Sequence, residues 1–190
     1  MLEAFLLSFG VIFVAELGDK SQLMALTFAT RYRIVPILIG ITLATLVVHA
    51  FSVLLGATVA ALIPQRLITL IAALAFFGFA IWTWRGDELD DEEAGRARRG
   101  GRSAVIAVGV AFFLAELGDK TMLATITLAT REEALGTWLG STAGMVAADA
   151  LAVIIGAQLG ARLPETIVKR AAAVAFLVFG LILLWQAISG

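Results

Sequence analysis

The chain carries the sequence Ala-Glu-Leu-Gly-Asp-Lys-Ser at residues 15–21 and Ala-Glu-Leu-Gly-Asp-Lys-Thr at residues 115–121. The same shift of 100 residues aligns Gly40 with Gly140 and Pro64 with Pro164. A match that keeps its register without a gap over so much of the chain indicates an internal repeat. The protein therefore consists of two related halves, and residues 15–21 and 115–121 are called here the first and second motifs.

The composition predicts a membrane protein. Of the 190 residues, 61% are hydrophobic and 15% are charged, whereas soluble domains average about 45–50% apolar and 25% charged residues. The apolar residues form six runs, each near the length of about 20 residues that spans a bilayer. These runs cover residues 4–30, 34–63, 67–84, 103–130, 135–163 and 166–188. We therefore predict an all-α integral membrane protein with six transmembrane helices.

Each half contains three of the predicted spans. Because three is an odd number, the second half enters the membrane from the side opposite to the first, which is the inverted-topology repeat of many secondary transporters. The predicted division is a first three-helix repeat at 1–85, a charged linker at 86–102 and an inverted second repeat at 103–190.

The basic residues of the loops predict the orientation, because lysine and arginine are retained on the cytoplasmic side. Placing both termini outside the cytoplasm puts ten basic residues inside and leaves only Arg66 and Arg131 outside. The N-terminus has no basic region of a cleavable signal peptide, so the first apolar run is expected to remain as a helix. The short termini favour a plasma (inner) membrane. The net charge of −1 excludes a nucleic-acid partner, which would require a basic face.

Ionisable side chains at membrane depth are the candidates for function, because a charge at the bilayer centre costs about 2.5–3.5 kcal/mol even on permissive scales. They are Glu16, Asp19, Lys20, His49, Glu116, Asp119, Lys120 and Asp149. In a continuous helix, residues three or four apart share a face. We therefore expect each motif to place its two carboxylates on one face and Lys20 to neutralise Glu16. Gly18 and Gly118 instead allow close helix contact or an opening of the helix that exposes carbonyl oxygens.

The motifs predict a cation site made of oxygen ligands. The carboxylates of both halves, with the hydroxyl groups of Ser21 and Thr121, suit Ca²⁺, Mn²⁺ or Mg²⁺. The chain has no cysteine, so thiolate metal sites are excluded. Carboxylates crowded in a low dielectric also bind protons, so protons and metal should displace each other. No cofactor is expected, since a metal bound at such a site would be a substrate of the protein.

Four other residues are paired by the repeat. His49 corresponds to Asp149, and Gln22 corresponds to Met122. Asp149, His49 and the two motif lysines are candidates for proton coupling or counter-charge, although a lone membrane histidine is as often a hydrogen-bonded packing residue. Gln22 and Met122 could complete a coordination shell, but packing is the favoured interpretation.

The doubled Glu-x-Gly-Asp-Lys-Ser/Thr motif resembles the Golgi-type calcium/manganese transporter family and its bacterial manganese exporters. The resemblance covers nearly the whole chain and carries over residue by residue to both motifs. It implies that Glu16, Asp19, Glu116 and Asp119 bind the cation, and that the protein exports Mn²⁺ or Ca²⁺ in exchange for protons. The preference for manganese comes from the resemblance alone.

Three other interpretations remain open. The Glu–Lys pairs of the motifs could be buried ion pairs that only fix helix register. The protein could be a membrane scaffold or metal-delivery subunit without transport of its own. An intramembrane metal-dependent hydrolase acting on a lipid phosphate would need arginines at membrane depth, and the predicted spans contain only Arg162 and Arg170, each near a span end. We therefore predict a transporter and not an enzyme.

Overall fold

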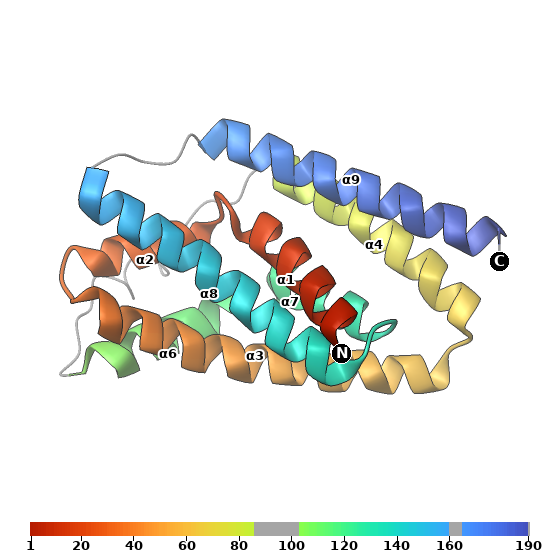
Figure 1. Cartoon of the computed structure of the whole chain (residues 1–190), viewed down its shortest axis with the longest axis horizontal. Coiled ribbons are helices and arrows are strands. Elements are labelled where there is room, and N and C mark those ends of the chain that lie inside the picture. The colour runs from red at the N-terminus through yellow and green to blue at the C-terminus, as the bar shows by residue number, and fades with distance from the viewer. Residues whose placement is uncertain (86–102, 160–164, 190) are drawn as a thin grey trace.

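In a computed structural model, residues 1–85, 103–159 and 165–189 are described, and all regular structure among them is helical (Figure 1). The helices are α1 (Leu2–Glu16), α2 (Lys20–Ala29), α3 (Ile34–Leu62), α4 (Gln65–Arg85), α6 (Ala104–Glu116), α7 (Lys120–Ala129), α8 (Ala134–Leu159) and α9 (Glu165–Ser189). The all-α prediction is confirmed for these residues, whereas the predicted linker at 86–102 lies outside them.

The prediction that residues 4–30 and 103–130 form two continuous helices is wrong. Each run is divided into two shorter helices, because Gly18 and Gly118 adopt left-handed backbone angles, with φ of 75° and 80°. Within the described ranges, the helices long and apolar enough to cross a membrane are Ile34–Leu62, Gln65–Arg85, Ala134–Ile154 and Arg170–Ser189. Helix α1 has 15 residues, or about 22 Å at 1.5 Å per residue, less than the roughly 30 Å of the hydrocarbon core.

The two halves of the chain pack against each other through equivalent helices. Helix α1 lies along α8, α6 lies along α3, and α4 and α9 form a pair beside them (Figure 1). Helices α3 and α8 run in opposite directions across the bundle, and both chain ends lie toward the right-hand side of the view. Each motif-bearing helix is therefore held against a long helix of the other half.

Glycines allow these helices to approach closely. Gly136, Gly140 and Gly144 form a row at i, i+4 and i+8 on α8, and it faces the backbone of α1 at Met1, Phe5 and Phe9. A Cβ atom added at Gly144 would lie 2.6 Å from the carbonyl oxygen of Phe9. Gly40, the repeat counterpart of Gly140, faces α6 in the same way, because its Cβ would lie 2.8 Å from the carbonyl oxygen of Val105. Small residues at such positions are typical of close helix contacts in membranes.

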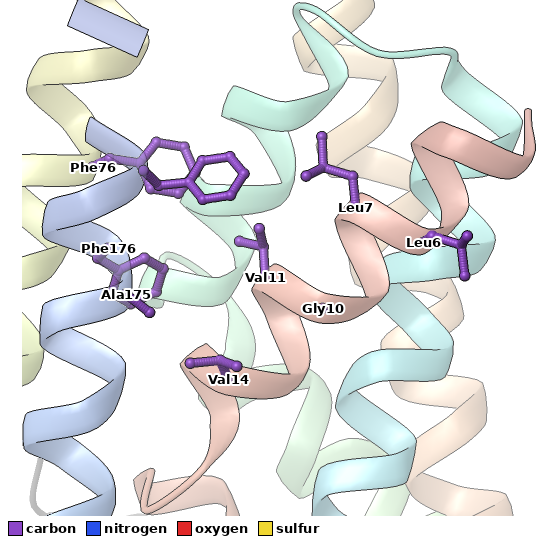
Figure 2. A pocket seen from close by; sticks show the side chains of 9 residues that line it. Leu6, Leu7, Gly10, Val11, Val14, Phe76, Ala175 and Phe176 are labelled. Atoms are coloured by element: carbon purple, nitrogen blue, oxygen red, sulfur yellow. The ribbon is translucent and has the colours of Figure 1, made fainter. Parts of the chain in front are cut away.

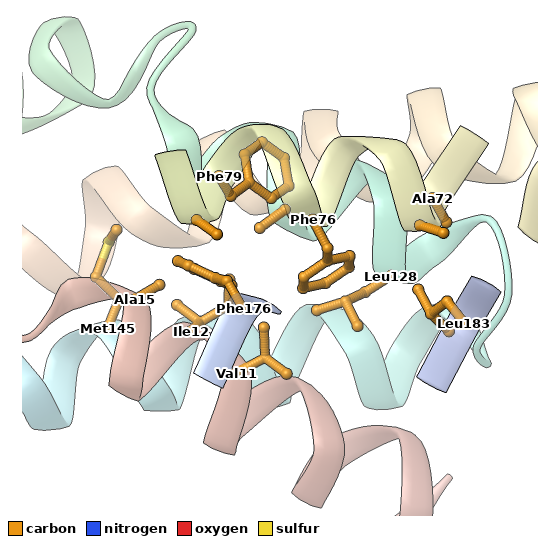
Figure 3. Packing of buried hydrophobic residues seen from close by; sticks show 13 residues of the cluster. Val11, Ile12, Ala15, Ala72, Phe76, Phe79, Leu128, Met145, Phe176 and Leu183 are labelled. Atoms are coloured by element: carbon orange, nitrogen blue, oxygen red, sulfur yellow. The ribbon is translucent and has the colours of Figure 1, made fainter. Parts of the chain in front are cut away.

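An apolar cluster joins the α4–α9 pair to the rest of the protein (Figure 3). The ring centroid of Phe76 on α4 lies 5.8 Å from that of Phe176 and 5.3 Å from that of Phe179, both on α9. Ile12 of α1 and Leu128 of α7 are buried in the same cluster. Aromatic side chains at these separations stabilise packing beyond the area that they bury.

A pocket of about 330 Å³ lies between α1 and the α4–α9 pair (Figure 2). Its wall is made of apolar residues, including Leu7, Val11, Phe76 and Phe176. A hard cation requires oxygen ligands, so this pocket does not suit the cation that the motifs predict.

Candidate cation site

Each motif folds as a break between two helices, with its two acids on either side of the break. Helix α1 ends at Glu16, Leu17 is extended, and Asp19 is the N-cap of α2. The amide N–H of Asp19 donates to the carbonyl oxygen of Glu16 at 3.1 Å. The expectation that Glu16 and Asp19 share a face of one helix is therefore wrong, because the chain turns between them. A carboxylate at a helix N-terminus is favoured by the dipole of that helix.

The second motif has the same arrangement. Helix α6 ends at Glu116, and Asp119 is the N-cap of α7, where its side chain accepts a hydrogen bond from the amide N–H of Thr121 at 3.4 Å. The amide N–H of Asp119 donates to the carbonyl oxygen of Glu116 at 3.3 Å. Both halves thus present one glutamate at a helix C-terminus and one aspartate at the following N-terminus.

The side chains of Gln22 and Met122 contact the backbone at the two helix breaks. The amide N–H of Gly18 donates to Oε1 of Gln22 at 2.9 Å, and the amide N–H of Gly118 lies 3.2 Å from Sδ of Met122. Gln22 also donates from Nε2 to the carbonyl oxygen of Ala148 on α8, at 3.1 Å. These contacts give both side chains a structural role in the turn.

The hydroxyl groups of the motifs bind the glutamates. Ser21 donates through Oγ to Oε1 of Glu16, and Oγ1 of Thr121 donates to Oε2 of Glu116 at 2.8 Å. The second oxygen of each glutamate is buried and has no hydrogen-bond partner among the described residues. Each glutamate therefore keeps one oxygen with which it can bind a cation or hold a proton.

The motif lysines make ion pairs between the two halves. Nζ of Lys20 lies 3.4 Å from Oδ1 of Asp119, and Lys120 donates through Nζ to Oδ1 of Asp19. The expected neutralisation of Glu16 by Lys20 assumed four residues of continuous helix, and the break at Gly18 removes that geometry. The ion pairs instead connect each motif to the aspartate of the other.

Asp149 belongs to the same charged cluster. The carboxylates of Glu116, Asp149 and Asp19 lie close enough to Glu16 to repel its negative charge. Asp19 also repels the negative charge of Asp149. Asp149 is fully buried on α8, and neither of its carboxylate oxygens has a hydrogen-bond partner in the described part of the chain. The fold therefore brings carboxylates of both motifs and of α8 within electrostatic range of one another.

His49 occupies the corresponding position on α3 but has different surroundings. Its ring is fully buried, and Nδ1 lies 3.4 Å from Oγ1 of Thr142 on α8. This contact fits the packing interpretation of the histidine. The two halves are thus similar in their motifs and different at His49 and Asp149.

The lysine pairs also limit what the carboxylates can bind in this conformation. Among the described residues, no three histidine, aspartate or glutamate side chains converge closely enough to hold a metal ion. A cation that uses carboxylates of both motifs therefore requires these side chains to rearrange, and the two aspartates are held by ammonium groups.

Comparison with known proteins identifies the family. The family described as "Divalent cation/proton antiporter GDT1" matches residues 4–91 and 104–190. The chain belongs to the GDT1 family. The predicted relationship to calcium/manganese transporters is thereby confirmed, and a GDT1 protein belongs to a transport family and not to an enzyme family.

Individual relatives cover most of the chain. A Vibrio cholerae protein named "Putative manganese exporter" is 35% identical over 178 residues, covering 92% of this chain and 87% of the relative. GDT1-like protein 5 of Arabidopsis thaliana is 29% identical over 217 residues, covering 95% of each chain. GDT1-like protein 4 of Oryza sativa subsp. indica is 29% identical, covering 95% of this chain and 73% of the relative. No solved structure matches the chain.

The helix break in the second motif leads to a testable prediction about the residue at Gly118. Gly118 has a φ of 80°, and a Cβ added there meets no atom of the described residues within 4 Å, so its replacement changes the backbone energy without a clash. We expect Gly118→Ala to lower the free energy of unfolding by about 1–2 kcal/mol, because residues with a Cβ disfavour left-handed angles. Gly118→Asn should cost less, because asparagine tolerates this region.

Thermal unfolding of the purified protein, followed by tryptophan fluorescence, measures this effect. Gly78→Ala is the matched control, because Gly78 lies inside α4 and has no left-handed angle, and its added Cβ meets no atom within 4 Å in the described part of the chain. This control should be neutral or stabilising, since alanine favours a helix. Equal unfolding temperatures for Gly118→Ala and the wild type would contradict the broken-helix geometry.

Proposed function

We propose that this GDT1 protein exports a divalent cation from the cytoplasm in exchange for protons, with Mn²⁺ as its first substrate and Ca²⁺ as its second. The observation that carries the proposal is the cluster of buried carboxylates from both motifs, joined by the Lys20–Asp119 and Lys120–Asp19 pairs. The family description supports cation/proton exchange. The name of the Vibrio cholerae relative supports manganese.

The proposed ligands are the acids and hydroxyl groups of the motifs. They are Glu16, Asp19, Ser21, Glu116, Asp119 and Thr121. Carboxylate and hydroxyl oxygens are suitable ligands for Mn²⁺ and Ca²⁺. One oxygen of each glutamate has no hydrogen-bond partner among the described residues, which supports the glutamates as the first groups to bind the cation.

Charge balance supports exchange between one divalent cation and two protons. The four motif acids, Asp149 and the two lysines sum to −3 when all are ionised. Binding of one divalent cation or of two protons leaves −1 in either case, and both loaded states are less costly in the membrane than the unloaded one. Asp149 is the stronger candidate for proton coupling, because both of its oxygens are buried without a hydrogen-bond partner among the described residues; His49 is the weaker one.

The proposed topology is six crossings in two inverted halves, 1–85 and 103–190, with the linker 86–102 in the cytoplasm and both termini outside. In this arrangement α1 with α2, and α6 with α7, each make one broken crossing. Broken helices whose ends point at a site near the midplane are typical of secondary transporters. The equivalent packing of α1 on α8 and of α6 on α3 supports a pseudo-twofold relation between the halves. The plasma membrane is the proposed location.

Transport by purified protein in liposomes tests the function. With the vesicle interior one pH unit more acidic than the outside, we expect Mn²⁺ to accumulate inside, and Ca²⁺ to accumulate more slowly. With the membrane potential held at zero, exchange of two protons per cation allows about 100-fold accumulation, and one proton about tenfold, because each proton moving down one pH unit releases about 1.4 kcal/mol.

The control is the same vesicle with a protonophore, which should abolish accumulation of both ions. Gradient-independent uptake would contradict proton exchange. Absence of any flux from correctly folded protein would contradict transport and favour a scaffold or metal-delivery subunit.

A further inference from the structure

The two lysine–aspartate pairs lie among the ligands of the proposed site. Each ammonium group reaches across the boundary between the halves to the aspartate of the other motif. The side chains of Asp19 and Asp119 are 0% and 1% exposed, and those of Lys120 and Lys20 are 4% and 15% exposed. Both pairs are therefore largely shielded from solvent.

Each pair connects two helices, and it also involves the proposed cation site, because the aspartates are the proposed ligands of a divalent cation. A lysine ammonium is a compact point charge on a flexible four-carbon chain, so it can leave a carboxylate by side-chain rotation alone. Unpaired buried charges are strongly unfavourable. The aspartates are thus stable when they hold either the tethered ammonium or the transported cation.

We propose that Lys20 and Lys120 are tethered counter-cations, which occupy Asp119 and Asp19 until the transported cation displaces them. This inference rests on the proposed function, and it specifies how the site is regulated. It explains why no three acidic or histidine side chains of the described residues converge while the lysines are in place. The helix break at each glycine is part of the same arrangement, because the break lets each lysine face the opposite motif.

The two pairs are not equivalent. The side chain of Lys20, which pairs with Asp119, is 15% exposed, whereas that of Lys120, which donates to Asp19, is 4% exposed. An ion pair that is more exposed is screened by solvent and is weaker. Lys20 therefore leaves its aspartate first, and Asp119 is the first aspartate to meet the incoming cation.

Calorimetric titration of the purified full-length protein with MnCl₂ tests the competition. We expect Lys20→Gln and Lys120→Gln to lower the Kd for Mn²⁺ by about threefold or more, because removal of a competing conformation raises the fraction of protein that can bind. Lys20→Arg should keep or raise the Kd, because arginine stays charged and binds carboxylates through two nitrogen atoms. Arg33→Gln, which removes an exposed charge at the start of α3, is the control and should leave the Kd unchanged.

A merely structural role predicts a different pattern, in which both glutamine variants weaken Mn²⁺ binding and Lys20→Arg restores it. That pattern would overturn the inference. If Lys120→Gln does not fold, Lys20→Gln alone tests the inference, because it changes the ion pair that is more exposed to solvent. A third outcome is that the wild type binds Mn²⁺, that Glu16→Gln abolishes this binding, and that the lysine variants have unchanged Kd values. This outcome would overturn the inference and leave the proposed function intact. Absence of Mn²⁺ binding by the wild type would overturn both.

Lysine labelling separates displacement from a simple effect of charge. The chain has three lysines, so Lys169 is an internal reference for reaction with an amine-acetylating reagent. Saturating Mn²⁺ should raise the acetylation of Lys20 and Lys120 at least about threefold relative to Lys169, with Lys20 responding at the lower Mn²⁺ concentration. Unchanged acetylation of both motif lysines in Mn²⁺-bound protein would show that the cation binds beside the ammonium groups and would overturn the inference.

Discussion

Replacement of Glu16 by glutamine is expected to lower gradient-driven Mn²⁺ transport by at least about 100-fold, and Glu116→Gln should do the same. Residues that only orient metal ligands cost 10–100-fold when changed, so loss of a charged ligand should reach or exceed that range. Glutamine has the size of glutamate, and its carbonyl oxygen can still accept the hydrogen bonds that Ser21 and Thr121 donate. The substitutions therefore remove charge while preserving packing.

Equal losses in the two variants would indicate one site shared by both halves. The measurement is initial Mn²⁺ flux into proteoliposomes under a fixed pH gradient, normalised to the amount of inserted protein. Glu3→Gln is the matched control, because Glu3 is exposed in the first turn of α1, and it should transport like the wild type. Wild-type flux in the double variant Glu16→Gln/Glu116→Gln would exclude these acids as ligands.

The largest expected loss of stability follows from a bulky residue at the contact between α1 and α8. A Cβ at Gly140 would overlap the backbone of Phe5, and a backbone atom cannot move aside as the end of a flexible side chain can. We therefore expect Gly140→Val to lower the free energy of unfolding by about 3 kcal/mol or more, at the upper end of the range for overpacked contacts. It should also reduce the yield of folded protein.

Thermal unfolding followed by tryptophan fluorescence measures this loss of stability. Two further variants serve as comparisons. Gly78→Val is the control, because a Cβ added at Gly78 meets nothing within 4 Å among residues 1–85, 103–159 and 165–189. Gly40→Val, at the repeat counterpart of Gly140, should destabilise the protein to a similar degree by separating α3 from α6. A stable Gly140→Val protein would contradict the close packing of α1 on α8.

Much of the protein's chemistry was predictable from short patterns. The apolar runs predicted helices, and the doubled motif predicted the family. The serine and threonine were expected beside the acids, and each donates a hydrogen bond to the glutamate of its own motif. These features depend on residues near one another in the chain or on composition averaged over long segments.

The helix breaks were only partly predictable. Glycine followed by aspartate is a signal for the end of one helix and the N-cap of the next. The strong apolar character of residues 4–30 and 103–130 favoured one continuous span in each case, although Gly18 and Gly118 left an opening of the helix possible. The observed left-handed angles and capping aspartates show that the local signal prevailed.

The linear order of residues accounts for the helical architecture, the repeat and the identity of the charged groups, because each follows from local composition or spacing. The partners of those charges depend on the packing of α1 against α8 and of α6 against α3, which brings together residues about 100 positions apart. Lys20 is close in sequence to Glu16, yet it forms an ion pair with Asp119. Pairing across the halves requires both helix breaks and the close contacts at Gly40 and Gly140, and only the three-dimensional arrangement of the two repeats combines them.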